Sequence, residues 1–293
     1  MKTHKLQALQ SGALSALILV VLLLVWHLAT LPVKSAAVSV VQLTAEQIEY
    51  QKLLGKDPGA AEGEKKNSGF PTLAQMGETV VKQLSHPFYD NGPNDKGIGI
   101  QLGHSLARVG LGFAIAALVA IPLGFLIGMS PMLYRALDPF IQVLKPISPL
   151  AWMPLALYTI KDSSISGIFV IFICSVWPML INTAFGVAGV RREWLNVAKT
   201  LEVSRLRLAF EVILPAAAPT ILTGLRISMG IAWLVIVAAE MLVGGTGIGY
   251  FVWNEWNNLS LTNVIFAIGV IGVVGMLLDG LFARAQKAIS YVE

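Results

Sequence analysis

Apolar and polar positions follow each other along the chain in long blocks. Apolar runs long enough to cross the hydrocarbon core of a bilayer lie at about 12–32, 105–129, 139–160, 165–189, 220–243 and 262–283. The first is the clearest, since Ala13 to Leu31 holds no Asp, Glu, Lys or Arg. Each Leu, Ile or Val near a helix centre favours insertion by roughly 0.3–0.6 kcal/mol, which offsets the cost of His27. The pattern predicts an all-α membrane protein, a bundle of about six transmembrane helices.

Two of these runs leave alternatives open. The first could be a cleaved signal peptide, with KSAAVS as the cleavage region, but signal h-regions of about 7–15 residues are shorter than this run. We therefore expect a retained helix. The third run is interrupted by Pro146, Pro149 and Pro154 and carries Lys145. Such breaks survive in membranes where neighbouring helices or water satisfy the freed backbone.

Composition supports the membrane assignment. The chain is 55% hydrophobic and 13% charged, with a mean hydropathy of +0.70. Soluble domains are about 45–50% apolar and about 25% charged. The net charge of +4 does not indicate nucleic acid, because the basic residues mostly flank apolar runs. Cys174 is the single cysteine, so an intrachain disulfide is excluded.

The basic residues between the runs predict the orientation. They precede the first run, follow the second, separate the fourth from the fifth, and follow the sixth; they are Lys2, Lys5, Arg135, Arg191, Arg192, Lys199, Arg205, Arg207, Arg284 and Lys287. If the runs alternate in direction, all of these residues lie on one side of the membrane. Cytoplasmic loops carry the excess of Lys and Arg, so both termini are predicted to be cytoplasmic.

The pattern divides the chain into three parts. Residues 1–34 form an N-terminal transmembrane helix, 35–100 an extracytoplasmic linker, and 101–290 the membrane core. Within the linker, LLGKDPGAAEGEKKNSGFP has a flexible, charged composition. PTLAQMGETVVKQL has apolar residues at helical spacing and predicts an amphipathic helix over about 72–85. This helix either lies on the membrane body or docks an outside partner.

The sequence holds no recognisable active site. It has no G-x-x-x-x-G-K-[ST] loop for nucleotide phosphates, and GGTGIGY at 244–250 predicts a tight turn at a helix end. Its four histidines lack metal-ligand spacing, and no Ser/His/Asp set can be assigned. We expect no catalytic, cofactor-binding or metal-binding residue. GFLIG at 124–128 favours close packing of helices.

A dense polar segment, NVAKTLEVSRLRLAFEVILP at 196–215, separates the fourth and fifth runs. Its apolar residues recur at steps that predict two short helices, with Ser204 as the N-cap of the second. A short amphipathic helix between two membrane helices suits a groove on another protein. It also suits the surface of an anionic bilayer, and the pattern alone leaves both open.

This segment resembles the cytoplasmic motif of permease subunits of binding-protein-dependent ABC importers. That motif reads E-A-A, three residues, G, nine residues, a hydrophobic residue, one residue, L-P. The spacing is intact here, with Asn196 in place of Glu, Val197 in place of Ala, and Glu202 in place of Gly. TGLRISMGIAWLVIVAAEML, HPFYDNGPNDKGIGIQ, LDPFIQVLKPISPLAWMPLAL and SGIFVIFICSVWPMLINTAFGV resemble the nitrate- and bicarbonate-type members of the nitrate–sulfonate–taurine branch.

The resemblance implies the type I importer permease fold, in a bacterial cytoplasmic (inner) membrane. It implies a homodimer, two cytoplasmic ATPase subunits that bind ATP and Mg, a periplasmic or lipid-anchored binding protein, and no nucleic acid. The loop at about 191–215 would then be the coupling helix. Its expected coupling residues are Asn196, Val197, Ala198, Lys199, Leu201, Glu202, Val203, Arg205 and Arg207, with Val197, Ala198, Leu201 and Val203 as the apolar contact.

Ionisable residues within the runs need partners or water, because each costs at least about 2.5–3.5 kcal/mol at the bilayer centre. Arg108 and Glu240 map toward the outer end, and Arg226 and Asp279 toward the inner end. We expect two interhelical ion pairs or, alternatively, an arginine that offers positive potential to a passing anion. The translocation-path candidates are Arg108, Ser148, Thr159, Asn182, Thr183, Arg226, Ser228 and Glu240.

The main hypothesis is therefore a pore-forming importer subunit for a small inorganic anion, with nitrate or nitrite first. Bicarbonate and then an organosulfonate are the alternative substrates. A secondary transporter would work without ATPase partners, but such proteins commonly show paired internal repeats, and none is found here. A membrane anchor would need no glycine-rich bundle and no polar residues within the membrane.

Overall fold

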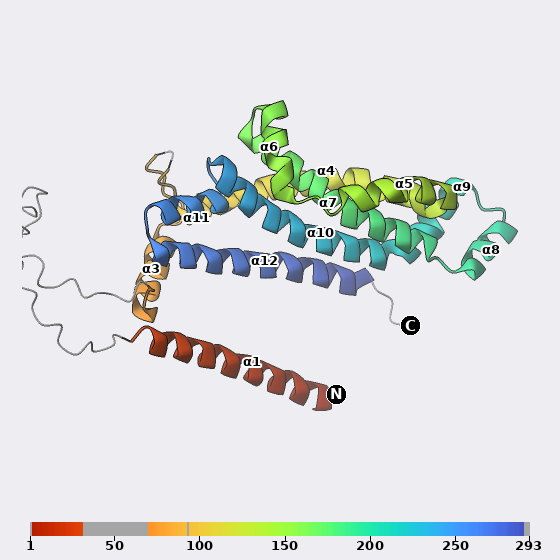
Figure 1. The fold of residues 1–293 in the computed structure, drawn as a ribbon. Helices are drawn as coiled ribbons and strands as arrows, with labels where there is room; N and C mark the ends of the chain where they lie inside the picture. The colour runs from red at the N-terminus through yellow and green to blue at the C-terminus, as the bar shows by residue number, and fades with distance from the viewer. Residues whose placement is uncertain (1, 32–69, 93, 290–293) are drawn as a thin grey trace, which may run out of the picture. The chain divides into compact units, whose positions relative to one another are not determined.

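A computed structural model describes residues 2–31, 70–92 and 94–289 (Figure 1). In these ranges the regular structure is helical, apart from one isolated antiparallel bridge between Asp90 and Lys96. The helices are α1 (Lys2–Ala29), α3 (Leu73–Ser85), α4 (Ile98–Met129), α5 (Pro131–Leu144), α6 (Pro149–Ile160), α7 (Ser163–Ala188), α8 (Arg192–Thr200), α9 (Arg205–Arg207), the π-helix Leu208–Ile213, α10 (Leu214–Val243), α11 (Ile248–Asn257) and α12 (Leu261–Ile289).

The chain divides into two compact units, Met1–Lys82 and Gln83–Glu293. In the first, the Trp26 indole donates to the Pro71 carbonyl at 3.0 Å and meets Phe70 edge-on. The first predicted span is helical, as α1, whose apolar part is Gln10–Ala29. The amphipathic helix predicted at 72–85 is confirmed as α3. The charged linker before it lies at 32–69, outside the described residues.

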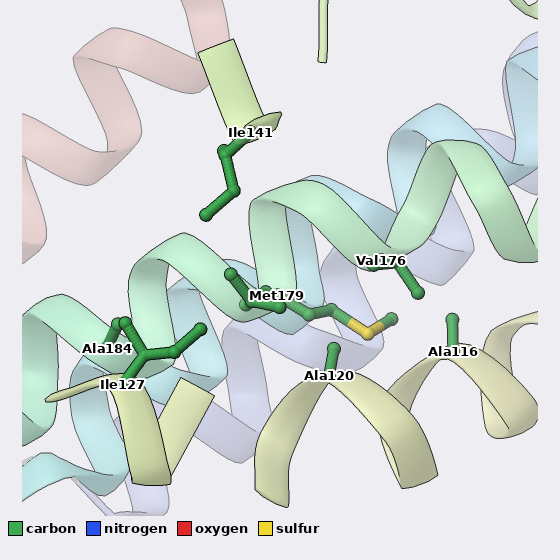
Figure 2. Packing of buried hydrophobic residues seen from close by; sticks show 8 residues of the cluster. Ala116, Ala120, Ile127, Ile141, Val176, Met179 and Ala184 are labelled. Atoms are coloured by element: carbon green, nitrogen blue, oxygen red, sulfur yellow. The ribbon is translucent and has the colours of Figure 1, made fainter. Parts of the chain in front are cut away.

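In the second unit α4 and α7 run parallel, packed through small residues. A Cβ atom on Gly112 would meet Ile171, and one on Gly128 would meet Val187, so the residue numbers rise together along both helices. Gly124 and Gly128 both face α7, which confirms the close packing expected of GFLIG. Figure 2 shows Ala116 and Ala120 of α4 beside Met179 of α7 in this core. Such small residues let two backbones approach closely.

Helix α10 runs antiparallel to α7, and α12 runs antiparallel to α10. The Ser228 hydroxyl of α10 donates to the Ser175 carbonyl at 2.8 Å, and the Trp233 indole donates to the Ile271 carbonyl at 3.0 Å. In the most apolar stretches of α7 and α10, 44% of residues are buried, against 28% in α4 and 17% in α12. Helices α7 and α10 therefore form the centre of the bundle.

Helices α5 and α6 form one broken span. The two axes meet at 91° across the break at 145–148. Because α4 and α7 are parallel, the α5–α6 pair must return the chain across the bundle. The described residues thus contain five helices long and apolar enough to span a membrane, or six spans with the bent pair. The expected fold class is confirmed, and the break falls at the prolines that predicted it.

Several predicted boundaries are wrong. The second span begins at Ile98 rather than 105, the third at Pro131 rather than 139, and α10 at Leu214 rather than 220. Hydropathy detects only the apolar part of a helix, whereas its ends depend on caps and turns. Here Ser130 caps α5, since its hydroxyl accepts a hydrogen bond from the Leu133 N–H at 3.4 Å.

The helix directions give the second unit two distinct ends. Met129, Ala188, Leu214 and Ile289 lie at one end, with the basic residues Arg135, Arg191, Arg192, Lys199, Arg205, Arg207, Arg284 and Lys287 on or beside it. We call this the basic end. Ile98, Ser163, Val243 and Leu261 lie at the opposite end. The charge asymmetry on which the orientation rests is thus present in the fold.

Candidate functional site

The basic end carries a projecting segment, Arg191–Pro215, that we call the arm. Helix α8 ends in a compact turn in which the Glu202 N–H donates to the Lys199 carbonyl at 3.0 Å and the Val203 N–H to the Ala198 carbonyl at 3.1 Å. These two bonds define a Schellman motif, which normally has glycine at the position of Glu202. The Ser204 hydroxyl then accepts the Arg207 N–H at 3.4 Å, so its predicted capping role is confirmed.

Glu202 adopts φ +50, a left-handed conformation that is unfavourable for residues with a Cβ. It occupies the glycine position of the family motif, and the fold keeps the turn although the glycine is absent. The substitution in the motif therefore changes the energy of the turn and leaves its geometry intact.

The arm exposes an apolar surface. Val197, Leu201, Leu206 and Phe210 are 60%, 70%, 75% and 66% exposed. Ala198 is buried and Val203 half-buried, so Ala198 packs against its own chain, contrary to the expectation of an outward contact. The charged residues expected around this surface, Lys199, Glu202, Arg205 and Arg207, are exposed, as is Asn196. Leu206 and Phe210 also belong to this exposed surface, although the expected contact did not include them.

The base of the arm is fixed to the bundle. Ile213, in the π-helix, is buried with Val187 and Val190 at the end of α7 and with Ala217 and Ile221 of α10. Pro215 lies in the first turn of α10, directly after the π-helix. The run from Arg205 to Val243 is continuous enough to count as one membrane helix. Displacement of the arm would therefore act directly on α10.

The opposite end holds a buried polar network around Glu240. The Ser105 hydroxyl lies 2.9 and 2.8 Å from the two Glu240 carboxylate oxygens, and Arg108 Nη1 donates to Oε1 at 2.8 Å. The side chains of Arg108 and Glu240 are 14% and 4% exposed. Arg108 also donates to the Thr246 carbonyl at 2.6 Å and to the Ser164 hydroxyl at 3.0 Å. The network thus joins α4, α7 and α10.

The same network holds the glycine turn that opens α11. The Gly249 N–H donates to Glu240 Oε2 at 3.1 Å, the Ile248 N–H to the Ser105 hydroxyl at 2.9 Å, and the Gly247 N–H to Gln101 Oε1 at 2.5 Å. The first N–H groups of a helix otherwise lack partners. Gly244 and Gly245 adopt φ +78 and +92. GGTGIGY is therefore a helix-end turn, as predicted, and not a nucleotide loop.

Sequence reasoning identified the charged pair but missed Gln101 and Ser105. Both had a detectable signal, because Gln101, Ser105 and Arg108 are spaced to lie on one face of an apolar helix. Ser164, on α7, had no such signal, since its proximity depends on the packing of α4 against α7.

The second expected ion pair also forms. Arg226 of α10 donates from Nε and Nη2 to the two carboxylate oxygens of Asp279 of α12, both at 2.6 Å. The side chains are 39% and 54% exposed, in contrast to the Arg108 pair. Nearby, the Gln286 amide donates to the Thr223 hydroxyl at 2.9 Å. This bidentate pair links α10 to α12 toward the basic end.

The other path candidates do not form one site. Ser148 is exposed at the α5–α6 break, and the Thr159 hydroxyl donates within its own helix to the Leu155 carbonyl. Asn182 donates to the Pro178 carbonyl at 2.8 Å. Ser228 is buried and bonded to α7, and the buried Thr183 hydroxyl has no partner among the described residues. Ser148 is exposed and forms no side-chain hydrogen bond within the described residues, and Asn182 lines a separate cavity beside Tyr134 and Arg135. Within the described ranges, no cluster of His, Cys, Asp or Glu could hold a metal ion.

Comparisons with known proteins agree with this architecture. Residues 120–291 match the family "Binding-protein-dependent transport system inner membrane component". Over 226 residues the chain is 47% identical to the nitrate import permease protein NrtB of Synechocystis sp., covering 77% of this chain and 82% of the relative. It is 46% identical over 208 residues to the bicarbonate transport system permease protein CmpB of the same organism, covering 71% and 74%.

Among solved structures, an amino acid ABC transporter superposes with a TM-score of 0.57 at 14% identity, covering 74% of this chain and 99% of that one. At this identity the likeness supports the fold alone. The family match spans more than half of the chain, and it favours the importer hypothesis over a secondary transporter or a membrane anchor. This multi-pass membrane protein belongs to the permease family of binding-protein-dependent ABC importers, in the branch that includes the nitrate and bicarbonate permeases.

Proposed function

We propose that this chain is the pore-forming subunit of an ATP-driven importer for a small inorganic anion, with nitrate or nitrite as the first candidate substrate. The assignment of the substrate rests on the 47% identity to a nitrate import permease over most of both chains. Bicarbonate is the second candidate, because a bicarbonate permease is almost equally similar, at 46%.

The arm is the site at which the ATPase subunits act. Its exposed Val197, Leu201, Leu206 and Phe210 form an apolar surface on short helices, the form that an amphipathic helix takes in a groove. Lys199, Arg205 and Arg207 surround it with charges that pair at the rim. A bilayer surface would also accept such a helix, but the base of the arm is packed in the core, which suits transmission of force.

ATP hydrolysis is then coupled to transport through two conformations of the ATPase subunits. ATP and Mg bind to the ATPase subunits, which close on ATP and open after hydrolysis. This closure shifts the permease between outward- and inward-facing states because the two ATPase conformations differ in their affinity for the two arm positions. The chain itself is not an enzyme in this scheme, and two copies of it enclose the path.

The orientation follows from the charges. The basic end faces the cytoplasm of a bacterial inner membrane, and both termini of the chain lie on that side. The opposite end, with the loop at 86–97 and α11, faces the periplasmic or lipid-anchored binding protein. A membrane-impermeant cysteine reagent applied to sealed cells should leave an arm cysteine at position 202 unmodified, and modification there would invert the topology.

Copurification tests the ATPase site. Glu202→Pro replaces φ +50 with the φ of about −65 that proline requires, so it disrupts the α8 turn. We expect it to abolish copurification of the ATPase subunits while membrane insertion persists. Glu202→Gly is the matched control, because it preserves the turn and should copurify normally. Normal copurification of the proline variant would overturn the coupling role.

Uptake tests the substrate. The purified complex with its binding protein, in proteoliposomes loaded with ATP, should accumulate labelled nitrate. Accumulation of labelled bicarbonate with no nitrate uptake would move the assignment to the second candidate. Uptake of neither ion would overturn the proposal of a small inorganic anion.

A further inference from the structure

The break between α5 and α6 opens onto a cleft. Six of the residues that line it are Lys145, Ser148, Trp152, Cys174, Trp177 and Ile231. They come from the break itself, from the first turn of α6, and from the facing sides of α7 and α10. None of these residues except Ser148 was among the sequence candidates for the translocation path.

The cleft lies halfway through the bundle. Cys174 and Trp177 are near the middle of α7 (Ser163–Ala188), and Ile231 is near the middle of α10 (Leu214–Val243). Both helices are long enough and apolar enough to cross a membrane. The break at 145–148 is therefore at the depth of the bilayer centre rather than at either surface.

Such a break requires water or protein around it. Residues 145–148 interrupt the helical hydrogen bonding, and Pro146 and Pro149 have no N–H to donate. Non-helical backbone at membrane depth is tolerated only where it is buried in protein or lines an aqueous cavity. Because this stretch lines an open cleft, we infer that the cleft contains water in the assembled transporter.

Lys145 brings a positive charge to the edge of the cleft, since it lines this cleft and also a second cavity beside Asp138 and Gln142. Its side chain is exposed, and within the described part of the chain no carboxylate lies within ion-pairing distance of its ammonium group. Asp138, two turns earlier on α5, accepts a hydrogen bond from the Gln142 amide instead, at 3.4 Å. A lysine at the bilayer centre costs at least about 2.5–3.5 kcal/mol unless water or an anion compensates it.

The cleft also holds side-chain hydrogen-bond donors. Trp152 and Trp177 are half-buried, and their indole N–H groups meet no acceptor in the ranges that the structure describes. Trp26 and Trp233, by contrast, both donate to backbone carbonyls. An indole N–H can only donate, and Ser148 adds a hydroxyl. One cation and several donors without a carboxylate form the environment that a small oxyanion requires.

We propose that this cleft is a binding site for the transported anion in the middle of the membrane. Lys145 attracts the ion, and the Trp152 and Trp177 N–H groups and the Ser148 hydroxyl contact its oxygens. This assignment rests on the proposed function, since it takes the cargo to be a small oxyanion such as nitrate or bicarbonate. Conduction requires a site weak enough to release the ion, which a single lysine and neutral donors provide.

Cys174, the single cysteine of the sequence, is a native reporter for the cleft. The assembled complex is treated with anionic and cationic methanethiosulfonate reagents, and modification of this chain is followed by mass spectrometry. We expect the anionic reagent to react about tenfold faster, the lower end of the enrichment that a charged cleft produces. Nitrate should slow its reaction, and Lys145→Gln should remove the preference.

Three results would overturn the assignment. These are an unreactive Cys174 in both nucleotide-free and ATP-bound complexes, a reaction without charge preference, and a preference that survives Lys145→Gln. The last would mean that the Lys145 ammonium extends out of the cleft. Lys161→Gln is the matched control, because Lys161 is exposed at the end of α6 and does not line the cleft. It should leave the preference unchanged.

Uptake separates this inference from the proposed function. Relative to wild type, Lys145→Gln should lower nitrate uptake by about tenfold at low nitrate, because the variant loses the enrichment of the anion in the cleft. Lys145→Arg should retain most uptake, and copurification of the ATPase subunits should be normal in both. If wild type transports nitrate and Lys145→Gln equals it, the cleft assignment fails alone. If wild type transports neither nitrate nor bicarbonate, the proposed function fails, while the labelling result still tests whether the cleft attracts anions.

Discussion

The two ends of the bundle use polar residues in opposite ways. At the end away from the basic residues, where α11 begins, Glu240 is buried and its carboxylate is bonded to Ser105, Arg108 and the Gly249 N–H. At the basic end, the arm exposes its charges and four large apolar side chains, and Glu202 has a conformation that costs energy. One end is held by the paired polar network around Glu240, whereas the other exposes surfaces that no residue of the described chain covers.

The contrast indicates where stability and where assembly reside. A buried charged group contributes to folding only if its partners are complete, and removing one partner leaves the other charge uncompensated. Exposed apolar side chains on a short helix contribute little to the isolated chain and become useful when another protein covers them. Substitutions at the opposite end should therefore affect folding, and those on the arm should affect assembly.

The largest effect is expected for Glu240→Ala. It leaves Arg108 buried without its carboxylate and frees the Gly249 N–H, so we expect a loss of about 3–5 kcal/mol. The measurement is thermal unfolding in detergent together with the yield of folded protein in membranes. Glu193→Ala, an exposed glutamate in the first turn of α8, is the control. An unchanged melting temperature for Glu240→Ala would contradict the view that the network around Glu240 stabilises the fold.

Gly247→Ala should weaken the same end by a smaller amount. The added Cβ would collide with the Glu240 carboxylate, and overpacking of this kind costs about 1–3 kcal/mol. Gly230→Ala is the matched control, since nothing lies near a Cβ at that helical position. The pair is compared by melting temperature, and equal values would mean that the turn accommodates the methyl group.

On the arm, Glu202→Gly should stabilise the turn. Glycine adopts φ +50 without the penalty of a Cβ, so a gain of about 1 kcal/mol is expected. The measurement is backbone hydrogen exchange at the N–H groups of residues 202 and 203, which close the turn after α8 and should exchange more slowly in the variant. Faster exchange in the variant would show that the glutamate side chain itself supports the turn.

Arg226→Gln should change stability least among these substitutions at neutral pH. The Arg226–Asp279 pair is partly exposed, so water replaces much of the lost interaction. We expect assembled complex in near-normal amounts with a lower rate of nitrate uptake if the arginine faces the path. Loss of folded protein from the membrane would instead assign the pair a structural role like that of Arg108 and Glu240.

A last test at the opposite end concerns Tyr89, in the loop before α4. Burial, followed by the hydrogen bond to Asp95, raises the pKa of its hydroxyl from 10.0 to about 12. The fold therefore favours the protonated phenol, and this contribution is complete below pH 10 and lost as pH rises toward 12. Tyrosinate absorbance of the purified chain should show one late titration, which Asp95→Asn shifts to lower pH. An unshifted titration would leave the loop without this contribution.

The spans and ion pairs were predictable for a simple reason. Insertion depends on summed hydropathy, and a charge within the membrane must find a partner, so Arg108 and Glu240 could be matched by depth alone. The helix break was predictable too, because prolines lack the N–H that a helix requires. These are properties of residue types in order along the chain.

The rest depended on packing. Ser164 reaches Arg108 only because α4 and α7 lie parallel, and Lys145, Trp152 and Trp177 meet only because the chain bends by 91°. The burial of Ala198 and the left-handed conformation of Glu202 follow from the turn after α8. This turn was not predictable from the sequence, because the motif lacks the glycine that usually marks a left-handed position. No local pattern contains this information, since each case joins residues from different elements or a conformation against propensity.

The unbroken helical run from Arg205 to Val243 has a mechanical consequence. Its α10 part, Leu214–Val243, has 30 residues and extends about 45 Å at 1.5 Å per residue, so the base of the arm and Glu240 lie at opposite ends of one helix. A rotation of α10 about its axis would move the Glu240 carboxylate, and the glycine turn bonded to that carboxylate would have to follow. A displacement of the arm can therefore be carried by α10 alone to the polar network around Glu240.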